Sequence, residues 1–298
     1  MITDLNRRQF LASAAAAAAF PWLGSPQAAT ASHPLCVFTK ALQSLSYDQL
    51  ASRIAALGFS GIEAPIRTGG HIEPEEVREE LPKMVTALKK HGLEVTIMTS
   101  SVNSVSQPHT ETTLRIAAEL GIRQYRMQYF TYDADRPIRQ QIREIRGHLQ
   151  DLAALNLELG IQGLYQNHAG ERYFGAGLWD LEQALRGIDP AAIAVCYDVR
   201  HATVEGGQTW PITFRLLRNK IAALYAKDFT WGTGQGPQNT PLGWGRVNYP
   251  RFFEMVKESG FRGPISLHVE YIDHRDPKRV PEHLAAMGRD LETLKTWI

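Results

Sequence analysis

The chain has 298 residues, of which 44% are hydrophobic and 21% are charged, a composition typical of a folded globular protein rather than a disordered one. Its 32 Lys and Arg residues nearly balance its 31 Asp and Glu residues, so the sequence carries no excess positive charge of the kind that binds nucleic acid. Two cysteines, Cys36 and Cys196, are too few for a disulfide framework or a cysteine-rich zinc site.

The first 31 residues have the pattern of an export signal. An arginine pair, Arg7 and Arg8, precedes Phe10 and an alanine-rich apolar stretch that extends to about residue 23. This stretch is too short for stable insertion across a membrane, and small residues at 29–31 offer a cleavage site. Residues 1–31 therefore resemble a twin-arginine signal peptide. The resemblance implies the twin-arginine export machinery as a partner, a periplasmic or otherwise exported protein, and a mature chain of residues 32–298; an uncleaved alanine-rich helix is the alternative.

From residue 35 onward, helix-like segments that end in glycine alternate with short β-rich segments. We expect strands near residues 35–39, 60–64, 94–99, 123–128, 162–167, 193–198, 221–228 and 264–270. We expect helices near residues 47–57, 74–91, 110–120, 138–159, 177–187, 207–217, 249–259 and 280–297. Eight units of about 33 residues each predict a single α/β domain, a (β/α)8 TIM barrel. The alternative, an open doubly wound sheet, would normally have a glycine-rich turn after its first strand, and this sequence has none there.

Polar side chains gather at the predicted C-terminal ends of the strands. Side chains alternate along a strand, so the residues opposite in parity to the apolar, helix-facing ones point into the barrel. The inward set is Glu63, Gln166, His168, Asp198, Lys227, His268 and Glu270. Active sites of such barrels lie at this end. Buried charges require pairing or a cation, so the set is either a functional site, for which a divalent metal is suited, or a salt-bridged core with Lys227 against Asp198 or Glu270.

Three further residues are candidates for substrate binding. His201 follows Asp198 by three residues, at the mouth of the predicted barrel. His71 ends a Gly-Gly-His turn after the second strand, where a loop covers the pocket of a TIM barrel. Trp231 lies in a long Gly- and Pro-rich segment, residues 230–248, where an aromatic face can stack on a sugar ring.

Several short fragments occur in an order that resembles a known superfamily. They are residues 58–63 (Gly-Phe-Ser-Gly-Ile-Glu), 165–168 (Tyr-Gln-Asn-His), 198–201 (Asp-Val-Arg-His), 227–228 (Lys-Asp), 241–245 (Pro-Leu-Gly-Trp-Gly) and 263–271 (Gly-Pro-Ile-Ser-Leu-His-Val-Glu-Tyr). Over essentially the whole mature chain, they resemble the sugar phosphate isomerase/epimerase superfamily of xylose isomerase-like barrels.

The resemblance implies a divalent metal (Mn, Mg, Co or Zn) held by Glu, Asp, His and Glu from the last four strands. In this sequence the ligand set becomes Gln166, Asp198, His268 and Glu270, and Tyr225 stands where the family has its seventh-strand His. The neutral Gln166 and the protonated Tyr225 lower the expected affinity for metal. The expected catalytic residues are Glu270 or His168 as the base and Lys227 as the group that stabilises an oxyanion; His201, His71, Glu63 and Trp231 are expected to contact substrate.

The predicted function is thus an exported, metal-dependent isomerase or epimerase that removes a proton next to a carbonyl of a sugar or sugar derivative. Two alternatives stay open: a lyase or hydrolase acting on oxidised (3-keto) glycosides, and a carbohydrate-binding barrel without catalysis. A DNA-repair endonuclease on the same barrel is disfavoured by the neutral charge and the export signal. The expected partner is a small-molecule carbohydrate, and the sequence leaves the substrate and any homo-oligomer undetermined.

Overall fold

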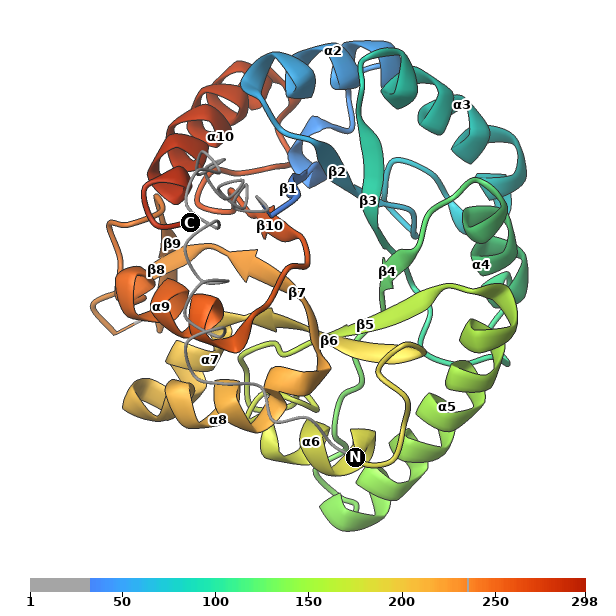
Figure 1. Ribbon diagram of the computed structural model, residues 1–298, viewed down its shortest axis with the longest axis vertical. Helices are drawn as coiled ribbons and strands as arrows, with labels where there is room; N and C mark the ends of the chain where they lie inside the picture. The colour runs from blue at the N-terminus through green and yellow to red at the C-terminus, as the bar shows by residue number, and fades with distance from the viewer. Residues whose placement is uncertain (1–32, 235) are drawn as a thin grey trace, which may run out of the picture. The chain divides into compact units, whose positions relative to one another are not determined.

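The computed structural model describes residues 33–298 except residue 235, so the predicted signal peptide, residues 1–31, lies outside the described residues. In the described part, eight parallel strands close into a barrel (Figure 1). The barrel strands are β1 (Leu35–Phe38), β2 (Gly61–Pro65), β3 (Glu94–Thr99), β4 (Gln124–Arg126), β5 (Gln162–Gln166), β6 (Ile193–Asp198), β7 (Ile221–Ala226) and β10 (Ile265–Leu267).

The barrel closes between its first and last strands. Cys36 of β1 lies beside Gly61 of β2 on one side and beside Ser266 of β10 on the other, both in parallel register. The order around the barrel is β1-β10-β7-β6-β5-β4-β3-β2, so each strand follows its sequence neighbour. The prediction of a single (β/α)8 barrel is confirmed, and the open doubly wound sheet is excluded.

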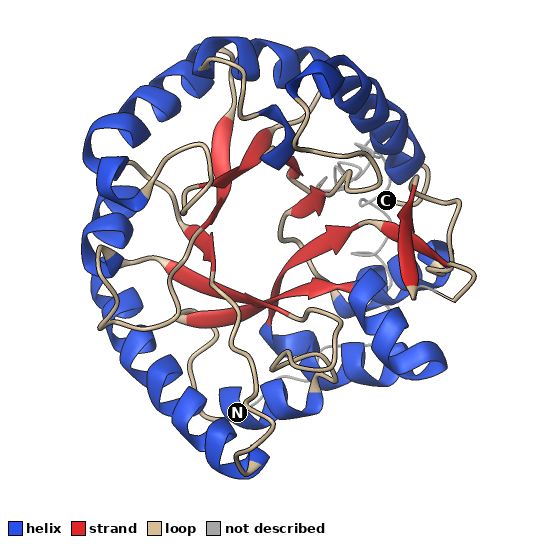
Figure 2. Cartoon of the chain, turned by 180° about the vertical axis from the view of Figure 1, so that it is seen from behind, coloured by secondary structure: helices blue, strands red, loops and turns tan. Residues whose placement is uncertain are grey.

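The helices form a ring outside the strands (Figure 2). They are α2 (Tyr47–Leu57), α3 (Val77–Lys90), α4 (Thr110–Glu119), α5 (Ile138–Leu159), α6 (Trp179–Leu185), α7 (Val199–Gly206), α8 (Trp210–Leu217), α9 (Tyr249–Ser259) and α10 (Val280–Lys295). Helix α2 shows how local sequence sets the ends of a helix. Ser46 and Gln49 form a reciprocal capping box at its start, and Gly58, at φ 88°, ends it. In residues 33–234 and 236–298, every helix is too short or too polar to cross a bilayer.

Two elements at the barrel mouth differ from the sequence prediction. Helix α7 begins directly after β6, because the Asp198 carboxylate accepts a hydrogen bond of 3.1 Å from the backbone N–H of His201 and caps the helix. A β-hairpin, β8 (Asp228–Trp231) and β9 (Pro237–Thr240), occupies part of the segment expected to be a loop. Both elements bring additional side chains to the C-terminal ends of the strands.

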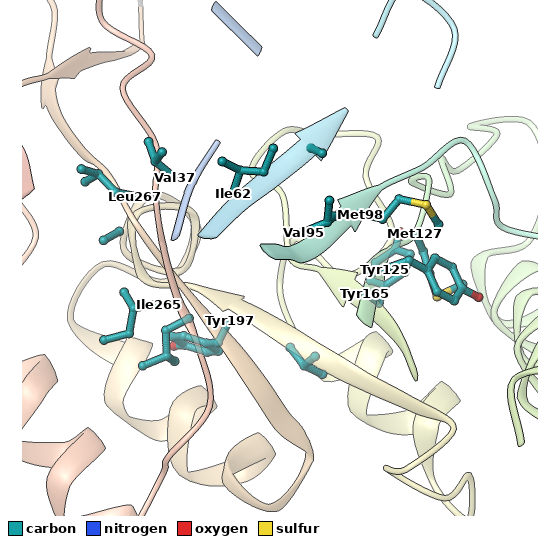
Figure 3. Packing of buried hydrophobic residues seen from close by; sticks show 14 of the residues in the cluster. Val37, Ile62, Val95, Met98, Tyr125, Met127, Tyr165, Tyr197, Ile265 and Leu267 are labelled. Carbon is teal, nitrogen blue, oxygen red and sulfur yellow. The ribbon is translucent and has the colours of Figure 1, made fainter. Parts of the chain in front are cut away.

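The hydrophobic core has two layers separated by the barrel wall. Outward-facing strand residues such as Ile62, Tyr197 and Ile265 belong to one cluster (Figure 3). Helix residues such as Leu50 belong to the same cluster. A second, smaller cluster fills the barrel interior with Cys36, Ile97, Leu164, Ala194, Cys196, Ala223 and Tyr225. Both cysteines are free and buried, as expected for small residues of the barrel core. The lumen above this cluster, toward the C-terminal ends of the strands, is polar.

Candidate functional site

Glu63 of β2 is the deepest charge of the polar layer and is fully buried. Its Oε1 accepts hydrogen bonds from Thr99 and Tyr225, its Oε2 accepts hydrogen bonds from Ser266 and His268, and Arg126 lies 3.4 Å away. Burial raises the pKa of Glu63, but the electrostatic attraction of His268 and Arg126 and the hydrogen bonds from His268 and Thr99 outweigh it and hold the pKa well below its usual range. Both oxygens are thus occupied by protein donors, and a substrate contact of Glu63 stays a prediction.

A chain of polar contacts runs from Arg126 of β4 through Gln166 of the adjacent β5 to Asp198 at the end of β6. The Oε1 atom of Gln166 accepts a hydrogen bond of 2.6 Å from Arg126 and another from the hydroxyl of Tyr129. The amide nitrogen of Gln166 donates a bond of 2.7 Å to Oδ2 of Asp198. Gln166 therefore uses both ends of its amide within the protein and fixes the orientation of the Asp198 carboxylate.

Lys227 follows β7 and places its ammonium between two carboxylates. Its Nζ atom lies 3.2 Å from Oδ2 of Asp198 and 3.0 Å from Oε2 of Glu270. Burial lowers the pKa of Lys227, but the two carboxylates outweigh that effect and raise it, so the group is an ammonium at neutral pH. Lys227 itself is buried, and Asp198 is completely inaccessible. The salt-bridged arrangement that the sequence left open is present, with Lys227 paired to both acids.

The neighbouring Asp228 has a separate, structural role. It points away from the lumen, and its carboxylate accepts hydrogen bonds of 3.0 to 3.1 Å from the backbone N–H groups of Gly243, Gly245 and Val247. The Pro-Leu-Gly-Trp-Gly motif is thus tied to the end of β7. This anchoring positions the chain that leads from the hairpin to α9 beside the barrel mouth.

His168, just beyond β5, has a defined tautomer. Its Nδ1 atom lies 2.9 Å from the backbone carbonyl oxygen of Ala169, which can only accept a hydrogen bond, so Nδ1 carries the proton and Nε2 holds a lone pair. Burial and, secondly, the charge of Lys227 lower the pKa of His168 to about 4. At neutral pH the ring is therefore an uncharged base.

His201, at the start of α7, stacks against His168 with ring centroids 4.1 Å apart. Its Nδ1 atom accepts a hydrogen bond of 3.0 Å from Arg200, so its Nε2 atom carries the proton. Burial holds the pKa of His201 well below its usual range. The buried Nε2–H group lies 3.5 Å from the Asp198 carboxylate and has no hydrogen-bond partner among residues 33–234 and 236–298. It is a donor available to a ligand.

These residues surround a cavity of about 320 Å³ at the C-terminal end of the barrel. Its walls are Phe38, Lys40, Ala41, His168, Arg200, His201, Lys227, Asn239, Val269, Glu270 and His274. The volume is at the lower end of small-molecule sites and suits a ligand of monosaccharide size. Four residues predicted from the sequence therefore share one cavity: His168, His201, Lys227 and Glu270.

Two other predicted substrate contacts lie away from this cavity. The Nε2 atom of His71 lies 2.9 Å from Oγ1 of Thr39, and the ring is not among the cavity walls. Trp231 is 54% exposed on the β8 strand and packs its ring edge against Phe229. Both side chains lie outside this cavity, because a side-chain contact with Thr39 holds His71 and the hairpin carries Trp231, and their contact with a substrate stays a prediction.

The four predicted metal ligands do not form a metal site. His268 is turned toward Glu63, with Nε2 and Oε2 2.8 Å apart, and the amide oxygen of Gln166 is taken by Arg126. The remaining acids, Asp198 and Glu270, hold the Lys227 ammonium between them. In the described residues, there is no group of three or more His, Cys, Asp or Glu side chains arranged to hold a metal ion. In this arrangement the donor set does not fit a divalent metal.

Sequence reasoning missed several residues of the site. Arg200 and Lys40 line the cavity, whereas Arg126 and Tyr129 support it from below. Arg200 lies within the Asp-Val-Arg-His fragment, so the signal was present. The direction of the Arg200 side chain depends on helix α7, which begins directly after Asp198, and the strand pattern did not reveal that helix.

Comparison with known proteins agrees with the barrel fold. A family model described as xylose isomerase-like TIM barrel matches residues 51–296. An inosose dehydratase of Mesomycoplasma hyopneumoniae is 23% identical over 287 residues, which cover 85% of this chain and 90% of the relative.

Two solved structures share the fold. A xylose isomerase domain protein from Planctomyces limnophilus has a TM-score of 0.66 at 15% identity and covers 89% of this chain and 97% of its own. A 3-keto-D-glucoside 4-epimerase from E. coli has a TM-score of 0.65 at 15% identity and covers 87% of this chain and 99% of its own. Since the family model spans most of the sequence, the chain belongs to the xylose isomerase-like TIM barrel family.

Proposed function

We propose that this protein is an enzyme that removes a proton from the carbon next to a carbonyl group of a sugar or sugar derivative. The observation that carries the proposal is the pairing of two groups in one cavity: the unprotonated Nε2 atom of His168 and the ammonium of Lys227. A base and a fixed cation in a partly buried site are the two elements that enolisation requires.

His168 suits the role of base better than Glu270. The pKa of Glu270 is raised by burial but lowered further by the ammonium of Lys227, and the outcome is well below the usual range. Its Oε2 atom is also bonded to Lys227 at 3.0 Å. Since base strength follows pKa, the His168 imidazole, with a pKa of about 4, is the stronger proton acceptor of the two. Glu270 then serves to hold Lys227.

Lys227 suits the role of oxyanion stabiliser. An ammonium has three N–H donors, and Asp198 and Glu270 take two of them. The third is available to a substrate oxygen in the cavity. As His168 takes the proton, the electron pair of the C–H bond forms a carbon–carbon double bond and the carbonyl electrons move to its oxygen. The resulting enolate oxygen faces Lys227, which supplies the positive charge without a metal ion.

The fate of the enolate decides the reaction class. Return of the proton to the other face of the same carbon gives epimerisation. Return to the former carbonyl carbon, with the proton of an α-hydroxyl passing to the carbonyl oxygen, gives isomerisation. Loss of a hydroxide or alkoxide from the β carbon gives elimination. The similarity to an inosose dehydratase and a 3-keto-D-glucoside 4-epimerase supports a carbonyl-bearing carbohydrate as substrate. We propose epimerisation and elimination as the candidate reaction classes.

Exchange of hydrogen with solvent tests this proposal. Mature protein is incubated in D2O with D-fructose, D-tagatose, an inosose and a 3-keto-glucoside, and deuterium incorporation is followed by NMR. We expect incorporation next to the carbonyl of at least one compound, and its loss by about 100-fold or more in His168→Asn. His109→Asn, at an exposed position, is the matched control and should behave as wild type. Saturable sugar binding without exchange would identify a binding protein and contradict the enzyme.

We also propose export by the twin-arginine pathway, on the strength of Arg7 and Arg8 and the apolar stretch behind them. The test is cell fractionation of the full chain and of a variant with both arginines replaced by lysine. Export predicts that the wild type is found outside the cytoplasm and that the variant is retained. Equal distribution of the two would contradict the assignment.

A further inference from the structure

Arg200 is a buried cation that the proposed reaction does not use. It lines the cavity, is 6% exposed, and has no carboxylate within 4 Å among the described residues. One guanidinium nitrogen donates to His201, and the guanidinium carbon lies 5.2 Å from the centre of the Phe229 ring. The Nε–H group is buried without a hydrogen-bond partner in residues 33–234 and 236–298.

An arrangement of this kind is costly in the absence of a ligand. A guanidinium stays charged in proteins, and a buried charge without a counter-ion is strongly disfavoured. Stacking on Phe229 recovers only part of that cost. The unpartnered Nε–H adds to it, as does the unpartnered Nε2–H of the adjacent His201. Two orphaned donors on neighbouring residues thus line the same cavity.

The charged groups around the cavity, taken together, also have an excess of positive charge. The ammonium of Lys227 is offset by Asp198 and Glu270. Lys40, which follows β1 and is half-buried in the cavity wall, has no ion-pair partner within 4 Å in the described part of the chain. Three cations therefore face two carboxylates, and the excess positive charge resides on Arg200 and Lys40.

We propose that Arg200 and Lys40 form an anion subsite, so that the substrate of this enzyme is a sugar derivative carrying an oxyanion group, a carboxylate or a phosphate. The planar guanidinium fork matches two oxygens of such a group, and Lys40 adds a point charge. The inference rests on the proposed function for the identity of the sugar, but anion binding is measurable without turnover. The subsite determines which sugars are accepted, whereas His168 and Lys227 determine the reaction.

Equilibrium binding by calorimetry tests the subsite with matched probes. D-glucose, D-glucuronate and D-glucose 6-phosphate differ mainly in the group at one end, so they separate a neutral sugar, a carboxylate and a phosphate. We expect one or both anions to bind at least about tenfold more tightly than D-glucose, with an affinity that falls as salt is added. The anion that binds more tightly shows whether the subsite prefers a carboxylate or a phosphate.

Variants then assign the effect to the two cations. Arg200→Gln and Lys40→Gln should each weaken anion binding by about tenfold while leaving D-glucose binding unchanged, and Arg200→Lys should recover part of the loss. Arg215→Gln, an exposed position on α8, is the matched control. Thermal melts followed by circular dichroism verify that each variant is folded.

Two results would overturn the subsite. One is equal affinity for neutral and charged probes in the wild type. The other is an equal loss for both kinds of probe in Arg200→Gln, which would make Arg200 a positioning residue for His201 only. Deuterium exchange separates this failure from that of the proposed function. Exchange on a ketose by a wild-type protein that binds neutral and charged probes equally would preserve the enzyme and reject the subsite, whereas anion binding without any exchange would do the reverse.

Discussion

The Nζ atom of Lys227 lies 3.2 Å from Oδ2 of Asp198, the same oxygen that accepts a hydrogen bond from Gln166 and lies 3.5 Å from Nε2 of His201. With Glu270 at 3.0 Å on its other side, the ammonium occupies the space between the two acids that the family resemblance assigns to a metal ion. A charged side chain directly after β7 thereby provides, within the chain, a cation at the barrel mouth.

Removing that ammonium should create an affinity for metal. Lys227→Ala leaves two carboxylates close together without a cation, and hard divalent cations favour such oxygen ligands. After equilibration with MnCl2 and desalting, elemental mass spectrometry should find more manganese in Lys227→Ala than in wild type. Lys278→Ala, at an exposed position, is the control. About one ion per chain in wild type, with no gain in the variant, would contradict the role given to Lys227.

Glu63 should be a determinant of stability rather than of binding. Glu63→Gln keeps the shape of the side chain but removes the charge that faces Arg126 and His268 and puts an amide nitrogen near existing donors. We expect the free energy of unfolding to fall by about 3 to 5 kcal/mol, as when one partner of a buried ion pair is removed. Urea unfolding measures this. Glu79→Gln, exposed on α3, should change it by less than about 0.5 kcal/mol, and a similarly small effect of Glu63→Gln would refute the assignment.

The pH at which activity declines should be lower than expected for a histidine with an ordinary pKa. A base works when it is unprotonated, and burial together with the Lys227 ammonium lowers the pKa of His168 from 6.5 to about 4, against the opposing pull of Asp198 and Glu270. The value of kcat/KM should therefore stay level from about pH 8 to about pH 5.5 and decline only below that. Circular dichroism at each pH identifies any decline due to unfolding. Half-maximal activity at pH 6.5 would indicate an unshifted histidine and argue against His168.

Much of the fold was predictable because its signals are local. Glycines such as Gly58 end the helices, and β-rich segments follow them at regular intervals, so the number of barrel strands and their approximate limits follow from the sequence. Alternation within a strand also placed the inward side chains correctly, since Asp198, Lys227 and His268 all face the lumen in the structure.

The pairing of these side chains was not predictable in the same way. Which acid His268 meets depends on the registers of β1 with β10 and of β1 with β2, and the two contacting residues lie 205 positions apart in the chain. Lys227 reaches the two acids because β6, β7 and β10 are adjacent. The distances from its Nζ atom to the two carboxylates cannot be obtained from the alternation of side chains alone. Arg200 was missed because the capping of α7 by Asp198 sets its direction.

The most direct test of the account is the rate of deuterium exchange before and after exhaustive chelation. The mature protein, active on whichever sugar exchanges, is treated with EDTA and dipicolinate, dialysed into metal-free D2O buffer and assayed again by NMR. Because Lys227 supplies the positive charge, we predict an unchanged rate in the chelated wild type and its loss in Lys227→Gln. Loss of exchange on chelation, with recovery on addition of Mn²⁺, would contradict the account and restore a metal to the centre of the barrel.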